Sequence, residues 1–366
     1  MSAEWDGCIP TRMAKLAVGL HAARVKTPQM TMVARSQGVS GGFITPPNQC
    51  ALRKAPVMRS TLHYATECDF PNFHFATRHY RVGRRFNSFS RIGFNAQDVQ
   101  EMGHALLASI PSGAVSEEEI RALALEILLK KGLPSRSRVT VSHVAWQLTR
   151  YLWDDARLKM VNESSSWASE DRAFVVDNSL CSINPDAALD YLLQRYVEAY
   201  GPVTRGDIVW WSGLDVRGLT AAIKRLLECG LIYEVSCNSS QKIFYIHRDA
   251  RFSGPSSVSC STTPIFLAYE DPFIKAYYET RWRYAGEYGL QALFYKTGEA
   301  RASVMLDGRI RGVWSLGVKA TNHTIMLCPE LAPGVRSRII DCWHEHLLRF
   351  DCSQRAEYSV AAHSFL

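Results

Sequence analysis

The segment AYGPVTRGDIVWWSGLDVRGLTAAIKRLLECGLIYEV, from Ala199 to Val235, carries the clearest structural pattern in the chain. Thr204 can cap a short helix that ends at Ser212-Gly213, and Val216 to Glu228 then carries apolar residues at helical spacing. Two β-branched and aromatic runs, 231–235 and 242–246, follow and flank the short polar loop 236–241. With a helix expected over 186–200 in front, this order predicts a winged helix, in which a hairpin follows a helix-turn-helix.

A similar order of elements occurs earlier in the chain. Ser116 and Glu119 form a capping box that opens one helix, and Gly132 ends it. The segment VSHVAWQLTRYLWDDARL, residues 141–158, predicts a second helix, and RAFVV, residues 172–176, predicts a strand. The sequence therefore predicts winged helices in tandem.

The C-terminal part has a different pattern. Residues 253–263 are rich in Ser, Gly and Pro, which is typical of a linker. Asp307-Gly308 lies between ARASVML and IRGVWSL and predicts a tight hairpin, and a closing helix is expected over 335–350. We expect an α+β chain whose tandem winged-helix domains are followed by a β-barrel-like domain. The expected divisions are a possibly truncated winged-helix-like region over 1–94, winged helices over 95–182 and 183–250, a linker over 251–263 and a β-rich domain over 264–366.

Composition narrows the function classes. The 366-residue chain has a net charge of +7 and a pI near 8.9, which suits a polyanionic partner without requiring one. There is no apolar run of membrane-spanning length and no signal-peptide core, so we expect an intracellular protein, cytoplasmic or nuclear. The ten cysteines include no Cys-x-x-Cys, and Cys342 with His346 makes only two ligands, so we predict no metal and no other cofactor.

Three segments carry a family likeness. YVEAYGPVTRGDIVWWSGL (196–214), MRSTLH (58–63) and VMLDGRIRGVW (304–314) resemble the winged-helix DNA glycosylases of the AlkZ type, in the same order. ARSQG (34–38) and EDPF (270–273) also fit, and the likeness extends over about residues 15–350. It implies a cleft that excises bulky or N7-alkylated purines from duplex DNA, in repair or self-resistance. N7-alkylation makes the base a good leaving group, so such an enzyme mainly stabilises the sugar cation and positions water.

The family's catalytic tripeptide is altered in this chain. A Gln-x-Gln or Gln-x-Asp sequence follows a Gly-Leu in the family, whereas this chain reads His21-Ala22-Ala23 at the matching place. The methyl group of Ala23 can neither bind water nor stabilise a cation. His21 can form hydrogen bonds and, near its ordinary pKa of about 6.5, could act as a base. We therefore assign His21 as the candidate catalytic residue, with Arg24 close to it in sequence.

Three hypotheses stay open. The protein is a glycosylase that uses His21, a DNA-binding protein without chemistry, or a fold recruited to small-molecule chemistry in secondary metabolism. A DNA-acting protein, expected to be a monomer, needs a basic track past the cleft. A recruited small-molecule enzyme predicts a closed apolar pocket instead.

The remaining candidates are basic residues and one further histidine. Arg59 and His63 are four residues apart on an expected strand, so both would lie on one face. RHYRVGRR, residues 78–85, is the densest basic run, and the helix predicted over 216–228 carries three basic groups. A solvated surface would explain each of these features as well as DNA contact does. The candidates for DNA or cleft contact are Arg24, Arg59, His63, Arg81, Arg84, Arg85, Arg217, Lys224 and Arg225.

Overall fold

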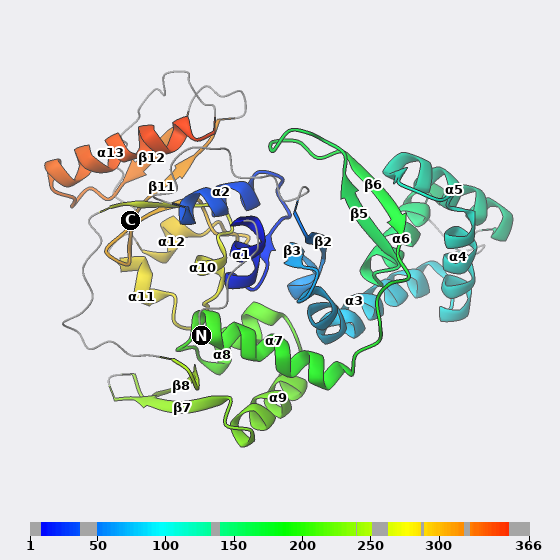
Figure 1. Cartoon of the computed structure of the whole chain (residues 1–366), viewed down its shortest axis with the longest axis horizontal. Coiled ribbons are helices and arrows are strands. Elements are labelled where there is room, and N and C mark those ends of the chain that lie inside the picture. Colours follow the sequence, from blue (N-terminus) through cyan, green and yellow to red (C-terminus); the bar gives the residue numbers. More distant parts are fainter. Residues whose placement is uncertain are drawn as a thin grey trace.

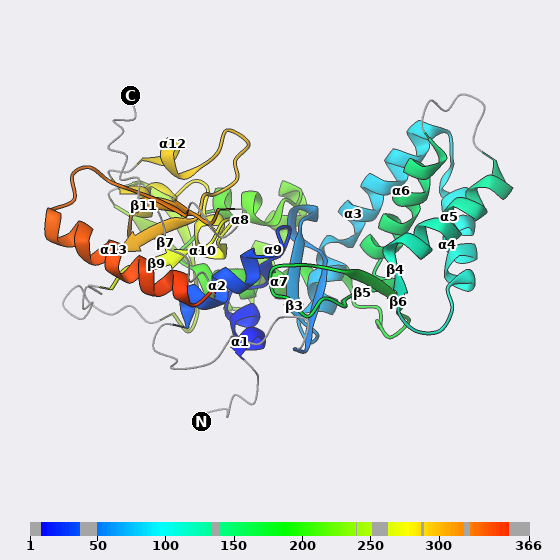
Figure 2. The same ribbon diagram turned by 90° about the horizontal axis from the view of Figure 1, so that it is seen from above.

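The computed structural model describes residues 9–36, 50–132, 140–238, 240–250, 263–286, 289–317 and 323–350. Helices and short strands alternate along the chain, and the strands of the described residues form four small antiparallel sheets of two to four strands. A helical arm, α3 to α6, extends to the right of Figure 1, and the C-terminal elements lie on the left. Figure 2 shows the same elongated arrangement from above. No helix in the described ranges has the length and apolar character needed to cross a membrane.

The N-terminal elements form a small sheet between two helices. The chain runs through α1 (Ile9–Leu16), β1 (Leu20–His21), α2 (Thr27–Arg35), β2 (Leu52–Pro56), the 3₁₀ turn η2 (Met58–Ser60) and β3 (Leu62–Thr66). The strand order is β1-β3-β2. His21 pairs with His63 in this register, so the two imidazoles are neighbours across the strands.

The helical arm follows. It contains α3 (Phe70–Ile92), α4 (Ala96–Ser109), β4 (Val115–Ser116), α5 (Glu117–Lys131), α6 (Val141–Asp154), β5 (Leu158–Asn162) and β6 (Arg172–Val176). The capping box at the start of α5 is confirmed, because the Glu119 N–H donates to Ser116 and the Ser116 N–H donates to the Glu119 carboxylate. Leu128, Val144 and Leu148 are fully buried in the core of the arm, as the amphipathic pattern requires.

The helices and the hairpin predicted around residues 199–235 are present. They are α7 (Pro185–Tyr200), α8 (Arg205–Ser212), α9 (Val216–Glu228), β7 (Ile232–Cys237) and β8 (Lys242–His247). β7 and β8 form an antiparallel hairpin, and Leu219, Ile223 and Leu226 of α9 are buried. Gly213 takes a left-handed conformation at φ 68°, which is the glycine C-cap that ends α8.

The C-terminal part is a four-stranded sheet with short helices. Its elements are β9 (Ile265–Leu267), α10 (Pro272–Lys275), α11 (Trp282–Ala285), α12 (Leu290–Leu293), β10 (Ser303–Leu306), β11 (Arg309–Ser315), β12 (Thr324–Leu327) and α13 (Pro333–Leu348). The order β12-β11-β10-β9 leaves β9 and β12 as edges, so the sheet does not close within the described residues. The hairpin at Asp307-Gly308 is confirmed, with both residues at positive φ and Leu306 paired to Arg309.

The first helices pack against the last sheet. Met30 and Val33 of α2 share a hydrophobic cluster with Trp314 of β11 and Trp343 of α13. Arg35 at the end of α2 forms two hydrogen bonds, of 2.8 and 2.7 Å, with the carboxylate of Asp271 at the start of α10. The N-terminal strands and the C-terminal sheet are therefore held next to each other, and the site described below lies between them.

One local expectation is wrong. Residues 58–66 do not form one strand, because Arg59 lies in η2 with a left-handed φ of 52° and β3 begins only at Leu62. RHYRVGRR lies inside the long helix α3. Most of the expected linker, 251–262, is outside the described residues.

Candidate active site

A cavity of about 380 Å³ lies between the N-terminal sheet, α8 and α10. His21 and His63 come from paired strands, and Arg59 comes from the turn that precedes β3. Arg24 follows β1 and also lines the cavity. The structure thus brings together four residues that the sequence predicted. It adds two that the sequence reasoning missed, Glu270 and Lys275.

The two histidines are neutral. Their rings meet edge to face with centroids 5.5 Å apart, and His63 Nδ1 donates to the Thr61 carbonyl at 3.0 Å. That bond leaves His63 Nε2 as an acceptor. Burial, followed by the charges of neighbouring groups, lowers the pKa of His21 to about 2, and burial lowers the pKa of His63 to about 4. Both imidazoles therefore stay uncharged at neutral pH.

Glu270 supplies a carboxylate beside His21. Its Oε1 accepts a hydrogen bond from the Ala300 N–H at 2.5 Å and lies 3.2 Å from Lys275 Nζ. Its Oε2 lies 3.8 Å from His21 Nε2, which is too long for a direct hydrogen bond. His21 Nδ1 is buried and has no hydrogen-bond partner among the described residues. A buried polar atom without a partner is costly, and in a cavity it is a place for water or a substrate group.

Backbone strain concentrates around this cavity. Val18, Arg59 and Glu270 line it and have φ values of 51°, 52° and 54°. Left-handed conformations cost non-glycine residues on the order of 1–3 kcal/mol each, and β-branched Val18 is the least expected of the three. Such residues gather at functional sites, where the surrounding structure holds them in place.

Two motifs from distant parts of the sequence support the cavity wall. Arg35 belongs to ARSQG and Asp271 to EDPF, and their buried ion pair fixes the start of α10 next to Glu270. Burial alone would lower the pKa of Arg35, but the charge and hydrogen bonds of Asp271 outweigh burial and raise it. Tyr200 of α7 donates to the Ala17 carbonyl at 2.7 Å and ties the other wall to α7.

Two of the three candidate arginines on α3 are held inside the protein by other groups. Arg81 is 1% exposed and donates to the Pro56 carbonyl at 2.9 Å, so it has no surface from which to contact a phosphate. Arg85 is partly buried and pairs with Asp154 at 2.5 Å. Arg84 is exposed, with its guanidinium 5.7 Å from the Tyr80 ring centroid.

The basic residues of α9 differ among themselves. Arg225 is held by Asp190 through bonds of 2.8 and 2.7 Å. Lys224 is 76% exposed and lies 3.6 Å from Glu228, and Arg217 is exposed. None of the α9 or α3 candidates lines the cavity around His21.

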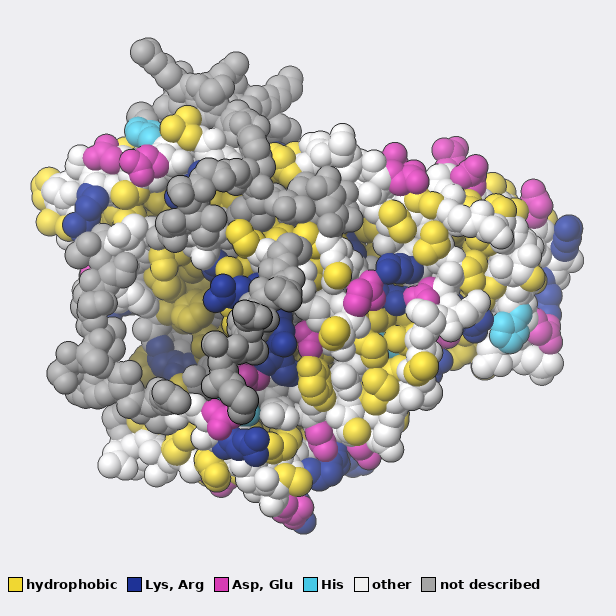
Figure 3. Space-filling view, in the orientation of Figure 1, with side chains coloured by type: hydrophobic (Ala, Val, Ile, Leu, Met, Phe, Trp, Pro, Cys, Tyr) yellow, Lys and Arg dark blue, Asp and Glu magenta, His cyan; other side chains and the backbone are white. Residues whose placement is uncertain are grey.

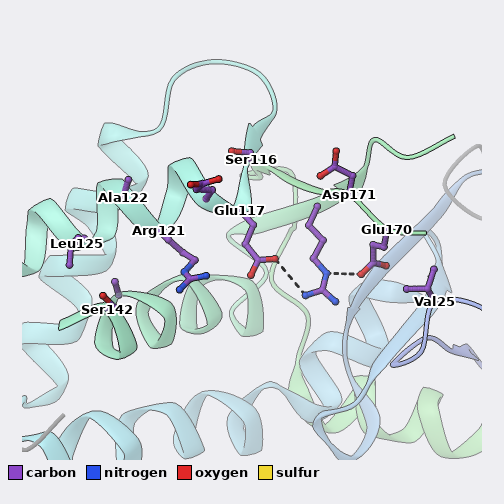
Figure 4. Close-up of a pocket in the computed structure, with 12 residues that line it drawn as sticks. Val25, Ser116, Glu117, Arg121, Ala122, Leu125, Ser142, Glu170 and Asp171 are labelled. Atoms are coloured by element: carbon purple, nitrogen blue, oxygen red, sulfur yellow. Dashed lines mark hydrogen bonds and ion pairs between the residues drawn. The ribbon is translucent and has the colours of Figure 1, made fainter. Parts of the chain in front are cut away.

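A larger hollow of about 810 Å³ lies on the helical arm, shown in Figure 4. Arg172 there spans Glu117 at 3.6 Å and Glu170 at 2.6 Å. Four acidic side chains line the hollow against two basic ones, namely Glu117, Glu118, Glu170 and Asp171 against Arg121 and Arg172. It contains no histidine, and its charge does not suit a polyanion. The smaller cavity around His21 is therefore the candidate site.

In this structure small sheets and helices surround a charged cavity that holds two histidines, a carboxylate and several cations. A family model described as DNA glycosylase AlkZ-like matches residues 48–350, so the chain belongs to the AlkZ-like DNA glycosylase family. The fold is similar to that of the Streptomyces sahachiroi DNA glycosylase AlkZ, with a TM-score of 0.73 at 15% identity. That likeness covers 98% of this chain and 95% of the other. A search of curated proteins found no match.

Family membership does not depend on the altered tripeptide. The family match begins at residue 48, so His21 lies outside it, whereas the structural likeness includes almost the whole chain. No group of three or more residues of the kinds that bind metals lies close enough to hold an ion in the described residues.

Proposed function

We propose that this protein hydrolyses the N-glycosidic bond of alkylated purines in duplex DNA, in the cavity that holds His21, Glu270 and Lys275. The observation that carries the proposal is the buried Glu270 carboxylate, 3.8 Å from His21. We take His21 to stand in for the first glutamine of the family's tripeptide, as the sequence likeness implies. In this proposal α5, α6 and the β5–β6 hairpin form one winged helix, and α8, α9 and the β7–β8 hairpin form another. The divisions predicted from the sequence, and a barrel-like C-terminal domain, are part of the same proposal.

The chemistry needs a negative charge and a positioned water. When the bond from C1′ to the base breaks, its electron pair leaves with the base, and the sugar becomes an oxocarbenium-like cation. The Glu270 carboxylate stabilises that cation from inside a cavity where charges interact more strongly than in water. Water adds to C1′, and its proton passes to Glu270 and then to solvent. The products are the free base and an abasic site.

His21 has a positioning task in this scheme. A histidine whose pKa lies near 2 is a poor base at neutral pH, but it can accept one hydrogen bond and donate another. A water beside the pair can donate to His21 and contact Glu270 together. His21 then does what a glutamine amide can do, and Glu270 supplies the charge.

The character of the lining favours DNA over a small apolar substrate. Arg24, Arg59 and Lys275 face the cavity with Glu270 and Glu299, so the cavity is not apolar. In the space-filling view of Figure 3, several basic side chains lie at a recess on the side of the C-terminal elements. A cavity bordered by cations suits a substrate attached to a phosphate backbone.

Base release tests the proposal. A duplex with a single N7-methylguanine is mixed with excess protein, and free base is quantified against time beside an undamaged duplex. Release from the damaged duplex well above spontaneous depurination supports the proposal. Binding of the duplex without release would leave the protein a non-catalytic DNA-binding member of the family.

A further inference from the structure

Trp210 of α8 is surrounded by cations, two of which, Arg59 and Lys275, line the cavity. The guanidinium carbon of Arg59 lies 4.4 Å from the indole centroid, Lys275 Nζ lies 4.7 Å away and the guanidinium carbon of Arg281 lies 5.3 Å away. Tyr278 is 53% exposed and stacks on the indole with centroids 5.7 Å apart and planes at 18°. We name these five residues the Trp210 cluster: Arg59, Trp210, Lys275, Tyr278 and Arg281.

The cluster gathers three cations, and the charge of one nearby carboxylate, Glu270, acts on two of them. Lys275 pairs with Glu270, but neither Arg59 nor Arg281 has a carboxylate within ion-pair distance in the described part of the chain. Burial lowers the pKa of Lys275, the Glu270 carboxylate opposes that shift, and the charges of Arg59 and Arg281 add to it. Like charges this close together destabilise one another, and an anion placed among them would relieve that cost.

The fold holds the cluster in place through α8. Asp207 is fully buried, and its Oδ1 accepts from the N–H groups of Tyr278 and Glu279 at 2.7 and 2.8 Å, which fixes the segment that carries Tyr278 and Arg281. A Cβ on Gly213 would lie 2.8 Å from Arg59 Cγ and 3.1 Å from its Cα. Only glycine therefore lets the end of α8 approach the strained backbone of Arg59 this closely.

Tyr278 stacks on the indole of Trp210, and cations lie near its ring. Trp210 therefore holds cations through cation–π contacts and does not offer a free face for stacking a base. A ligand there would be anionic, and guanidinium groups favour the oxygens of phosphate. Arg59 also lines the cavity. An anion bound by Arg59 would therefore lie next to a substrate group inside the cavity.

We propose that the Trp210 cluster binds a backbone phosphodiester of the nucleic-acid strand whose nucleotide enters the His21 cavity. The inference rests on the proposed function, since it takes the substrate to be a nucleotide within a strand. The cations that contact the strand come from η2, α10 and the segment after α10, and α8 arranges them.

The test measures DNA binding without chemistry. A labelled duplex with one tetrahydrofuran abasic-site analogue is titrated with the full chain between 50 and 200 mM KCl, and the slope of log affinity against log salt is compared among variants. Arg59→Gln and Arg281→Gln should each reduce the slope by about 0.9. Arg91→Gln is the matched control, because it removes the same charge from the exposed end of α3.

Three outcomes decide the inference. Reduced slopes in both cluster variants, with the parental slope in Arg91→Gln, support it, provided that urea midpoints show all variants folded. Cluster slopes equal to the Arg91→Gln slope overturn it. Binding of inorganic phosphate that is lost in the cluster variants, while those variants keep the parental slope for DNA, would assign the site to a small free anion and also overturn it. The duplex used here has no base to release at the modified position. The binding result therefore does not depend on whether the protein excises bases.

Discussion

His21 occupies β1 with its ring against His63, and the surrounding cavity keeps it neutral. His21→Ala removes the group that positions water, so we expect the rate of base release to fall about 100-fold. His21→Gln should stay within about tenfold of the parent, because an amide can also accept and donate a hydrogen bond. The measurement is single-turnover release of N7-methylguanine.

Two controls accompany the His21 variants. Thermal unfolding shows whether each variant is folded, and affinity for the abasic duplex shows whether it still binds. Full activity in folded His21→Ala would place catalysis elsewhere and remove His21 from the mechanism. Loss of activity in His21→Gln as complete as in His21→Ala would mean that the imidazole moves a proton.

Ala23 offers a gain-of-function test. It is exposed and lines the cavity, so a longer side chain has room there. Ala23→Gln restores the second polar group of the family's tripeptide, and we expect base release to rise by up to about tenfold through a further hydrogen bond near the sugar. Ala23→Leu, of similar size but apolar, serves as the control. An equal effect of the two changes would indicate that shape, and not hydrogen bonding, matters at this position.

The sequence predicted four of the six charged or histidine side chains assigned to the site. His21, Arg24, Arg59 and His63 were predicted and do share one cavity, although the single strand assumed for Arg59 and His63 was wrong. Glu270 was missed because it lies some 250 residues from His21, and only the EDPF likeness marked its position.

The burial of Arg81 could have been predicted from the helical spacing of its apolar neighbours. The buried positions of α3 include Phe70, Phe73, Thr77 and Arg81, at spacings of three and four. That periodicity places Arg81 on the inner face of a helix. The density of basic residues in RHYRVGRR favoured a surface interpretation instead, because long basic side chains are seldom buried.

At the scale of elements, α8 organises the site through Asp207. Its carboxylate accepts from backbone N–H groups of Thr204, Tyr278 and Glu279, and from the Thr280 hydroxyl. Asp207→Ala would leave several buried donors unsatisfied, and we expect it to lower the free energy of unfolding by at least about 3 kcal/mol.

Asp215→Ala is the matched control for that prediction. Asp215 caps α9 by accepting from the Gly218 N–H at 2.9 Å, and it is exposed. Loss of an exposed N-cap costs about 1 kcal/mol. Urea titration of both variants gives the comparison, and equal losses would show that Asp207 is no more than a helix cap.

Elements with local signals were predictable, and those set by distant contacts were not. The helices α5 and α7 to α9 follow from caps and apolar spacing within a few residues of each other. η2 depends on the approach of Gly213 to Arg59, which comes from more than 150 residues away. The packing of α2 on the C-terminal sheet could not be predicted either. The apolar face of α2 shows that the helix packs against something, but not against which element.

At the scale of the whole molecule, the buried histidines determine the response to acid. Burial lowers the pKa of His74 to about 2 and that of His346 to about 3, in addition to the two in the cavity. The unfolded chain binds these protons at the ordinary pKa of 6.5, whereas the folded chain does not. Stability is therefore present above about pH 6.5 and is lost as the pH falls below it, by about 1.4 kcal/mol per pH unit for each histidine.

His346→Phe isolates one of these contributions. The ring is 4% exposed, stacks on Phe266 at 4.8 Å, and has an Nε2 without a hydrogen-bond partner among the described residues, so phenylalanine fits its surroundings. We expect the dependence of unfolding free energy on pH between 6 and 4 to decrease by about 1.4 kcal/mol per pH unit. Urea titrations at several pH values measure it, and an unchanged slope would contradict the neutral state of His346.

The central claim is that the Glu270 carboxylate makes the cavity a site of glycosidic hydrolysis. The most direct measurement compares Glu270→Gln with the parent in single-turnover release of N7-methylguanine, at protein concentrations that saturate the duplex. Gln keeps the size of the side chain and can still accept from the Ala300 N–H, but it removes the charge that would stabilise the sugar cation. We predict a loss of at least about 100-fold in rate with little change in affinity for DNA. A Glu270→Gln protein that releases the base at the parental rate would contradict the account.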